Sequence, residues 1–117
     1  MARLLGTMRR TAAGVILAAL MLLVAAGASS AAELLMFEEQ GCPWCKRWHA
    51  EVGAGYPKTP EGRRAPLRQL DLMKPRPVGI KLAAPVTYSP TFVLVENGRE
   101  IGRIVGYPGA DFFWALL

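Results

Sequence analysis

The 117-residue sequence predicts an α/β domain in which a mixed four-stranded sheet carries helices on its faces. Three observations support this prediction. An apolar strand leads into a helix that begins near residue 42, a second apolar strand follows near residue 70, and the last third holds a β-hairpin signal and a short apolar helix. The expected order is therefore β-α-β, then a β-hairpin, then α, which is a minimal arrangement for one small domain.

A leader is expected ahead of this domain. Three arginines precede a long uncharged run that ends in small residues, which is the pattern of a secretory signal peptide. Ser30 and Ala32 would occupy the two positions that a signal peptidase reads, so we expect residues 1–32 to be the leader and residues 33–117 the domain. An uncleaved membrane anchor is the alternative, because the apolar run approaches the length that spans a bilayer.

The domain is expected to open with a strand and a helix. Residues 33–39, ELLMFEE, are apolar and bounded by charge, which predicts a buried strand. Cys42 stands where a helix N-cap would, Pro43 suits the first helical position, and glycines end the run at residues 53 and 55. Within this segment we expect Trp44 to be exposed in the turn and Trp48 to pack in the core.

The middle of the domain carries weaker signals. Residues 56–66 are punctuated by proline and glycine and predict a loop. Residues 66–73 alternate imperfectly between leucine and polar neighbours and predict a second strand. Residues 74–89 contain three prolines, and for them we expect a loop with a short helical turn.

The C-terminal third predicts a hairpin and a helix. Asn97-Gly98 lies between two β-rich runs, and this dipeptide is the strongest short hairpin signal. Residues 91–95, TFVLV, are continuously apolar as in a central strand, whereas residues 99–106 alternate as in an edge or near-edge strand. Residues 108–117 predict a closing helix with an apolar face of Phe112, Phe113, Trp114, Leu116 and Leu117.

The two cysteines of the chain, Cys42 and Cys45, are three positions apart where the first helix begins. Unpaired N–H groups in the first helical turn and the aligned peptide dipoles favour a thiolate at Cys42 and lower the pKa of this thiol. Cys45 is positioned one turn further to attack a mixed disulfide formed at Cys42. Pro43 and Trp44 tune how many donors remain for the sulfur. The pattern predicts a redox-active dithiol.

Other uses of two cysteines fit less well. Haem attachment requires histidine directly after the second cysteine, where this chain has Lys46. A structural disulfide over so short a loop would stabilise the fold little. Zinc requires four ligands, but two cysteines with His49 leave open a copper(I) site, so a soft-metal module is an alternative. Otherwise we expect His49 to be a partly exposed helix residue, with no metal and no cofactor beyond the Cys42–Cys45 disulfide.

This pattern resembles the thioredoxin superfamily. FEEQGCPWC is similar to the strand and active-site turn of that superfamily, SPTFVLV to its cis-proline segment, and ENGREIGRIVGYPGADFFWALL to its terminal hairpin and helix. The resemblance implies that Cys42 is the nucleophile, Cys45 the resolving cysteine and Pro90 a cis-proline facing them. Proline suits that place because only an X-Pro bond adopts cis at low cost. Ser89 would offer backbone groups to an extended substrate segment.

Within the superfamily, residues 34–72 are most similar to the small SoxS-type periplasmic thioredoxins of bacterial sulfur-oxidation systems. This resemblance implies a periplasmic dithiol reductase that keeps the cysteines of a sulfur-oxidation partner protein reduced, supplied by a thiol-electron donor in the membrane. A thiol oxidase or isomerase of the same fold is the alternative, because small changes in hydrogen bonding shift the balance between thiolate and disulfide.

One departure concerns the proton of Cys45. Many thioredoxins bury an acidic residue six positions before the first cysteine, and this chain has Met36 there. Glu38 and Glu39 lie nearer the turn, but the sequence does not tell which way their side chains point. The proton acceptor of Cys45 is therefore unassigned at this level.

Charge argues against nucleic acid as a partner. The chain has 14 basic and 9 acidic residues, but three of the arginines lie in the predicted leader. The remaining basic residues are scattered along the sequence and form no stripe, and no helix-turn-helix pattern is present. A mixed surface charge is typical of a soluble domain, and the leader places this domain outside the cytoplasm.

Overall fold

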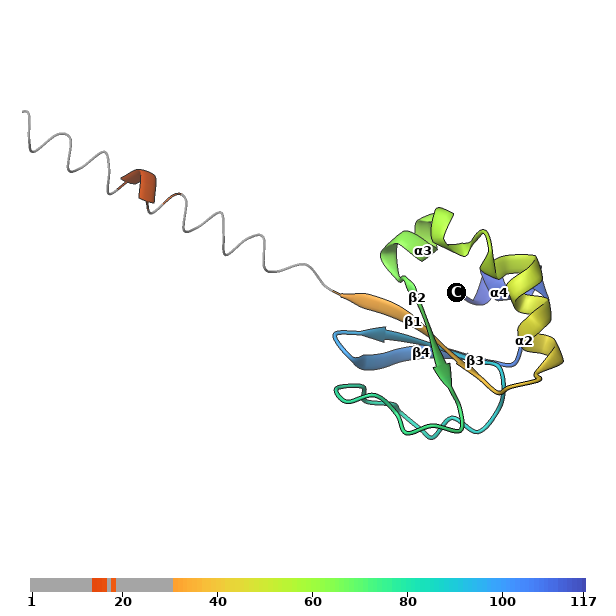
Figure 1. Cartoon of the computed structure of the whole chain (residues 1–117). Helices are drawn as coiled ribbons and strands as arrows, with labels where there is room; N and C mark the ends of the chain where they lie inside the picture. Colours follow the sequence, from red (N-terminus) through yellow and green to blue (C-terminus); the bar gives the residue numbers. More distant parts are fainter. Residues whose placement is uncertain (1–13, 17, 19–30) are drawn as a thin grey trace, which may run out of the picture. The chain divides into compact units, whose positions relative to one another are not determined.

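A mixed four-stranded sheet forms the centre of the domain, as predicted. The computed structural model describes residues 14–16, 18 and 31–117, so the predicted leader lies almost entirely outside the described residues. The strand order is β2-β1-β3-β4 (Figure 1), with β1 parallel to β2 and antiparallel to β3, and with β3 antiparallel to β4. The strands are β1 Ala32–Glu38, β2 Leu67–Asp71, β3 Thr91–Glu96 and β4 Arg99–Val105.

The register of the strands separates two apolar faces. Leu34 and Met36 of β1 lie in one buried cluster with Phe92 of β3, and Leu35 lies in a second cluster with Val93. Successive side chains of a strand point to opposite faces of a sheet, so the continuous apolar runs of β1 and β3 serve both clusters. Both strands lie inside the sheet, which confirms the central position expected for residues 91–95.

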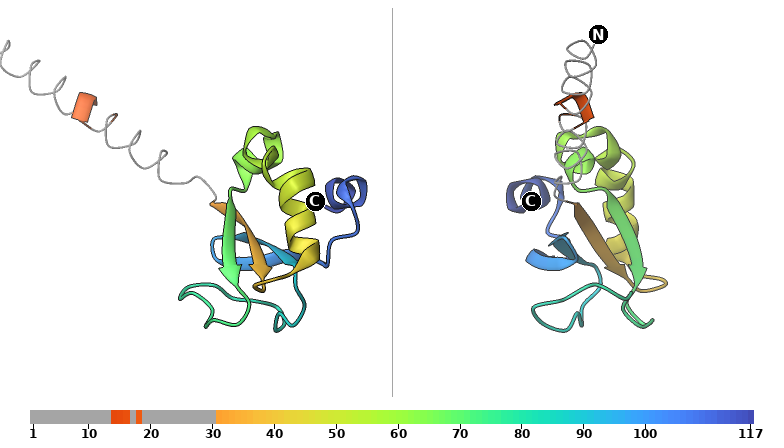
Figure 2. Two further views of the ribbon diagram at one scale, coloured as in Figure 1. Left: turned by 45° about the vertical axis from the view of Figure 1, so that its right-hand side comes forward. Right: turned by 90° about the vertical axis from the view of Figure 1, so that its left-hand side faces the viewer.

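The longer helical segments cover one of these faces. Figure 2 shows α2 and α4 on the same side of the sheet. The predicted first helix begins as expected, with Cys42 as N-cap and Pro43 in the first turn, and it continues as a short π-helical segment that ends at Gly53. The helical segments are α2 Pro43–Trp48, η1 His49–Gly53, η2 Tyr56–Lys58, α3 Pro60–Arg64 and α4 Ala110–Leu116.

Residues 56–66, for which a loop was expected, instead contain the 3₁₀ turn η2 and the helix α3. Thr59 is the N-cap of α3, and its hydroxyl accepts the N–H of Gly62 at 3.0 Å. Pro60 stands in the first helical turn, where its missing N–H has no cost. A side chain at position 62 would overlap the carbonyl oxygen of Tyr56, so glycine is required for this close approach. The prolines and glycines here build a compact helical turn.

Aromatic side chains fill the face between the sheet and the helices. The fully buried ring of Trp48 lies 5.1 Å from Phe92, 5.7 Å from Phe113 and 6.3 Å from Tyr56, measured between ring centroids. Offset or tilted ring pairs at such separations contribute beyond simple area burial. The core position expected for Trp48 is confirmed, and this cluster fixes α2 on the sheet.

The other face is covered by an extended segment between β2 and β3. Ile80, Leu82 and Val86 pack there against the cluster of Leu35 and Val93. The short helical turn expected in residues 74–89 was wrong, because the segment contains turns and one isolated bridge but no helix. Its prolines remove backbone donors and disfavour helix, so its apolar residues reach the sheet from extended backbone instead.

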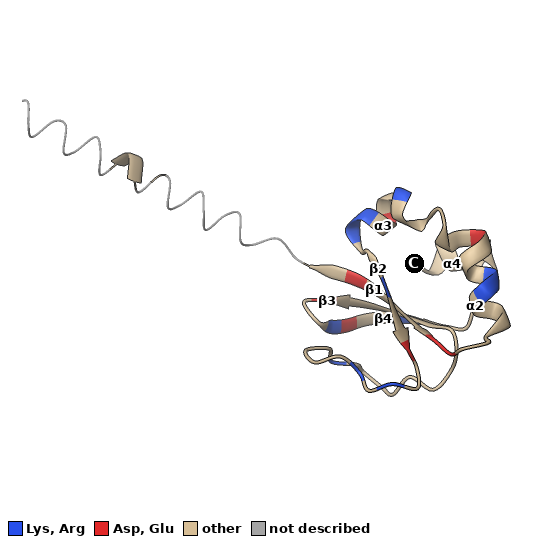
Figure 3. Ribbon diagram, in the orientation of Figure 1, with Lys and Arg blue, Asp and Glu red and all other residues tan. Residues whose placement is uncertain are grey.

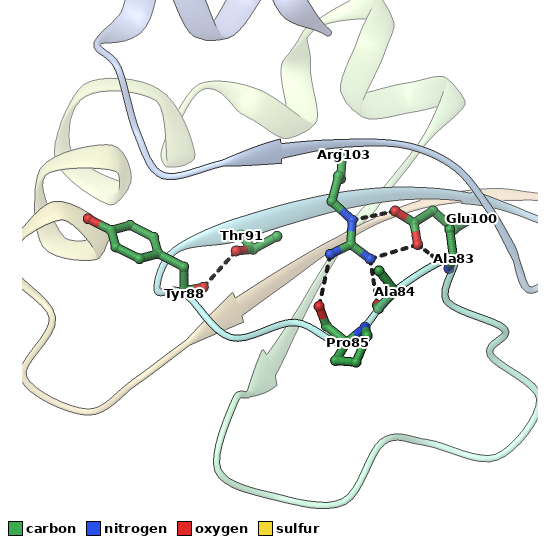
Figure 4. Close-up of polar contacts among 7 residues, drawn as sticks. All are labelled: Ala83, Ala84, Pro85, Tyr88, Thr91, Glu100 and Arg103. Atoms are coloured by element: carbon green, nitrogen blue, oxygen red, sulfur yellow. Dashed lines mark hydrogen bonds and ion pairs between the residues drawn. The ribbon is translucent and has the colours of Figure 1, made fainter.

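Side chains of β4 hold this segment in place, as Figure 4 shows. The guanidinium of Arg103 donates to the carbonyl oxygens of Ala84 at 2.7 Å and Pro85 at 3.2 Å, and Glu100 accepts the N–H of Ala83 at 2.6 Å. Arg103 also pairs with Glu100, and its hydrogen bonds hold the pKa of that carboxyl below its usual range. The pair therefore anchors the backbone that leads to residue 89.

The C-terminal hairpin and helix agree with the sequence, with one difference. Asn97 and Gly98 have φ angles of 51° and 78°, as a tight hairpin turn requires, and β4 is an edge strand. Helix α4 buries Phe113 fully, but Phe112 is 67% exposed and Leu116 is 62% exposed. The apolar face expected of this helix is therefore narrower than predicted, because α4 contacts the core along one side only.

Charges are spread over the surface of the domain. Figure 3 shows lysine and arginine on α2, α3, β4 and the segment after β2, with acidic residues between them and no basic stripe over the described part of the chain. Among the residues that the structure describes, no helix is both long and apolar enough to cross a membrane.

Replacing Tyr56 with phenylalanine is expected to reduce the free energy of unfolding by about 1–3 kcal/mol at neutral pH, because the carbonyl oxygen of Ala65 loses its 2.6 Å donor inside the core. Burial raises the pKa of Tyr56 to about 12, and a neighbouring carboxylate, Glu61, adds to this. Unfolded tyrosine titrates near 10, so the wild type should lose stability from about pH 10 to 12. The Tyr56→Phe variant should lose less stability over that pH range, because it has no hydroxyl at this position to ionise. Denaturant unfolding measures both effects, and the exposed Tyr88→Phe is the control.

Candidate functional site

The two cysteines form a disulfide where β1 leads into α2. Cys42 is partly exposed, whereas Cys45 is only 3% exposed and belongs to the core cluster. The backbone N–H of Cys45 donates to the sulfur of Cys42 at 3.1 Å. This hydrogen bond is the N-cap interaction that favours negative charge on the first sulfur, as the sequence predicts for Cys42.

Local backbone geometry presents Cys42 at the surface. Gly41 has a φ of 80°, and the N–H of Cys42 donates to the carbonyl of Glu39 at 3.3 Å, so a tight turn ends the strand. Cys42 has an extended backbone, and Pro43 then starts the helix with a φ that proline adopts naturally. The outer sulfur therefore sits at the helix start and the inner one packs beneath it.

The segment before β3 brings a second group to the sulfurs. The peptide bond between Ser89 and Pro90 is cis, and Pro90 is fully buried. The Ser89 hydroxyl lies 3.2 Å from the sulfur of Cys45 and accepts the N–H of Glu39 at 2.9 Å. A disulfide sulfur carries no proton, so in this state the Ser89 hydroxyl is the donor. Ser89 thus connects the turn and the inner sulfur by its side chain, a contact that sequence reasoning did not include.

Removing the Ser89 hydroxyl should slow the step in which Cys45 attacks a mixed disulfide at Cys42. In the variant Ser89→Ala, the Cys45 thiolate loses a hydrogen bond of the charge-assisted kind, which is worth about 1.5–3 kcal/mol. We expect the intramolecular attack by Cys45 to slow by about tenfold or more. Rapid-mixing kinetics of disulfide formation measure this step. Ser89→Thr keeps a hydroxyl and should stay close to the wild type, and equal rates for the alanine and threonine variants would contradict the expectation.

A polar network holds Trp44 beside the turn. The indole is 48% exposed, which confirms the exposure expected from the sequence, and Arg47 lies 5.6 Å from its ring centre. Arg47 donates to Glu51 at 2.6 Å, and the hydroxyl of Tyr107 donates to the same carboxylate at 2.6 Å. The hydrogen bond from Tyr107, followed by that from Arg47, keeps the pKa of Glu51 below its usual range. The charged state of this network therefore persists over the ordinary pH range.

The pKa of Tyr107 is shifted in the direction opposite to that of Glu51. Burial, followed by its hydrogen bond to Glu51, raises the pKa of Tyr107 to about 12. The tyrosine remains a donor at neutral pH and ties η1 to the chain after β4. Nothing in the local sequence links residues 51 and 107, so this contact was not predicted.

His49 is partly exposed, as expected, but it has a partner that the sequence did not indicate. Its Nε2 atom lies 2.6 Å from a carboxylate oxygen of Glu38. The other ring nitrogen borders Gly53, where an added methyl group would lie 3.1 Å away. Neither nitrogen therefore points at the sulfurs. Among the described residues, no group of three or more histidine, cysteine or acidic side chains is placed to hold a metal ion.

The structure brings together most of the residues proposed from the sequence. Cys42, Cys45 and Ser89 are linked by a disulfide and a hydrogen bond, and Pro43 and Trp44 form the exposed first turn of the same helix. Met36 is fully buried in the cluster that contains Cys45. The position of the acidic residue in many thioredoxins is therefore apolar here.

Comparison with known proteins identifies the family. A family model described as a thioredoxin-like domain matches residues 21–117. The crystal structure of the periplasmic thioredoxin SoxS from Paracoccus pantotrophus, in its reduced form, is 54% identical, covers 72% of this chain and 88% of that one, and superposes with a TM-score of 0.70. A search among curated protein sequences gave no match.

More distant structures agree in fold. Thioredoxin from Fasciola hepatica is 20% identical over 73% of this chain and 77% of its own, with a TM-score of 0.51. Thioredoxin-2 of the malaria parasite is 22% identical over 75% and 82%, also with a TM-score of 0.51. The family and the Cys42–Cys45 disulfide together show a thiol–disulfide oxidoreductase. By the family model and by this similarity, the chain belongs to the thioredoxin-like family.

Proposed function

We propose that this protein is an exported dithiol reductase. The observation that carries the proposal is the unequal exposure of the two sulfurs, because Cys42 reaches the surface while Cys45 is 3% exposed. A partner disulfide can approach Cys42 alone. Cys42 is then the nucleophile, and Cys45 is the resolving cysteine that completes the exchange.

The surface around Cys42 is proposed to receive an extended segment of a partner protein. Trp44 offers a half-exposed aromatic surface beside the sulfur, and Pro43 leaves one backbone donor fewer at the turn. Ser89, which precedes Pro90, lies at the inner sulfur, and the Ser89 backbone would pair with the substrate. No cofactor other than the disulfide is required for this exchange.

The partner and the compartment are proposed from similarity. A periplasmic thioredoxin, SoxS, is 54% identical, and residues 1–32 have the pattern that predicts a secretory leader. We therefore place this protein in the periplasm, acting on cysteines of a sulfur-oxidation carrier protein and supplied by a membrane thiol-electron donor. Ala31 exchanges two hydrogen bonds with Asn97, at 2.8 and 3.3 Å. Cleavage after Ala32 would remove both of them, and the mass of the exported protein identifies the cut.

The reduction potential of the Cys42–Cys45 pair tests the direction of electron flow. The protein is equilibrated with thiol buffers, and the two redox forms are quantified after acid quenching. We expect a value near that of thioredoxin, about −270 mV. A value near that of DsbA, about −120 mV, would make the protein an oxidant and overturn the proposal. Absence of a reversible two-electron transition would also overturn it, and copper(I) binding by the two thiols would be the next measurement.

A further inference from the structure

The Glu38–His49 contact joins the strand and the helix on either side of the redox pair. Glu38 is the last residue of β1, and His49 directly follows α2. Side chains alternate along a strand, so Glu38 points to the same face as Met36, which packs in one cluster with Cys45. The side chains of Glu38 and His49 are only 20% and 35% exposed, and they meet at 2.6 Å. The only histidine of the chain is thus tied to a carboxylate on the side of the sheet that holds the inner sulfur.

Both members of the pair are connected to Cys45, His49 along the helix and Glu38 through hydrogen bonds of its backbone. His49 is one helical turn after Cys45, on the same side of the helix, and its Nε2 atom meets Glu38. The peptide group between Glu38 and Glu39 donates to Ser89, whose hydroxyl contacts the sulfur of Cys45. Two hydrogen-bond contacts therefore separate the backbone of Glu38 from the inner sulfur.

Cys45 requires a proton acceptor because it is buried. A thiol is a poor nucleophile, and the thiolate that attacks must first lose its proton. At 3% exposure, water has little access to the sulfur, and burial disfavours the thiolate. Met36, the fully buried neighbour on β1, cannot take up a proton. Glu38 is the next residue along the same face of the strand, and it carries a carboxylate.

We propose that the Glu38–His49 pair accepts the proton of Cys45 in the resolving step. This proposal rests on the proposed function, in which Cys42 already forms a mixed disulfide with the substrate. The pair takes the Cys45 proton, the Cys45 thiolate attacks the Cys42 sulfur, and the bond from Cys42 to the substrate sulfur breaks. The substrate leaves as a thiolate and takes a proton from water. Two protein thiols are oxidised to one disulfide, and the substrate disulfide is reduced to two thiols. His49 is a positioning residue, because it holds the carboxylate from the helix side.

Other charged groups near the pair are few. Asp71 of β2 is paired in register with Glu38 and is exposed. Glu39 in the turn and Lys46 on α2 are exposed as well. The segment before β3 contributes the hydroxyl of Ser89 rather than a charge. Asp71 is therefore a carboxylate that lies next to Glu38 in the sheet and is not paired with His49. It provides the matched control.

Rapid mixing of the reduced protein with an excess of an aromatic disulfide that releases a coloured thiolate separates the two steps. The first release depends on the concentration of the reagent and reports attack by Cys42. The second is independent of that concentration and reports attack by Cys45. In Glu38→Gln we expect the second phase to slow by about 100-fold near neutral pH and to rise tenfold with each pH unit, because hydroxide must remove the proton. The first phase should change little.

A control variant distinguishes failure of the proton-acceptor proposal from failure of the proposed function. Asp71→Asn removes a neighbouring charge and should change the second phase by less than about twofold, since a screened surface charge has a weak effect. If Glu38→Gln matches Asp71→Asn in rate and in pH profile, the pair is not the proton acceptor, although the dithiol exchange stands. If the wild type shows no second phase at all, the proposed function itself fails.

His49 is tested by a replacement that keeps its donor. His49→Leu removes the hydrogen bond to Glu38 and should slow the second phase in the same direction as Glu38→Gln, by about tenfold. His49→Gln retains an N–H donor and should restore most of the rate. Equal second-phase rates for the leucine and glutamine variants would contradict the positioning role of His49.

Discussion

Serine in place of Cys42 is expected to abolish disulfide exchange, with no measurable turnover of a partner disulfide. The remaining thiol, Cys45, is 3% exposed and packs in the core cluster, so an incoming disulfide cannot reach it. Serine in place of Cys45 leaves Cys42 partly exposed and still capped by a backbone N–H of α2. That variant should carry out the first attack and then stop at the mixed disulfide. The effect of the same substitution thus depends on which sulfur is lost.

The two variants are compared by incubating each with an oxidised model protein and separating the products without reductant. Cys45→Ser should accumulate a covalent complex that a reducing agent dissolves, and Cys42→Ser should form none. Trapping by both variants would mean that the inner sulfur opens to the surface. Trapping by the Cys42 variant alone would reverse the two roles. If neither variant formed a covalent complex that a reducing agent dissolves, and the protein bound copper, the soft-metal alternative would be supported.

The sequence predicted the elements whose signals are local. Asn97-Gly98 specifies a hairpin because both residues accept positive φ, and the structure has this turn. Cys42 and Pro43 specify a helix start because the first turn requires a cap and tolerates a residue without an N–H. The same logic would have found α3, where Thr59 and Pro60 stand in the corresponding places. The surrounding prolines and glycines led to the prediction of a loop, although the signal for a helix start was present.

Other features depend on contacts between distant residues and left no local pattern. The segment that covers the second sheet face is aperiodic, and its course is set by Arg103 and Glu100, which belong to a strand that follows it. The site shows the same limit. Glu38 and His49 lie 11 positions apart, on a strand and on a helix, and only the packing of α2 on the sheet brings them to 2.6 Å. Sequence reasoning located the sulfurs, but it could not orient the carboxylates around them.

Replacing Trp48 with alanine is expected to lower the free energy of unfolding by about 3–5 kcal/mol, as large core truncations do. The rings of His49, Tyr56, Phe92 and Phe113 surround the indole within 6.3 Å, and a small domain cannot collapse around so large a cavity. Among the described residues, the indole N–H has no hydrogen-bond partner. Trp48→Phe therefore loses volume without leaving a polar atom unpaired, and it should cost clearly less. Trp44→Ala is the matched control, since its indole is 48% exposed.

Denaturant unfolding of these variants, followed by far-ultraviolet circular dichroism in the oxidised and the reduced protein, measures both stability and its dependence on redox state. The ring contacts of Trp48 include Phe92 of β3 and Phe113 of α4, which do not carry the disulfide, so the loss in Trp48→Ala should be nearly equal in the two redox forms. A loss confined to one form would mean that the indole senses the redox state of Cys45, three residues earlier on α2. A loss no larger than that of Trp44→Ala would mean that the aromatic cluster is not what fixes α2 on the sheet. The position of the inner sulfur would then depend mainly on the hydrogen bond from Ser89.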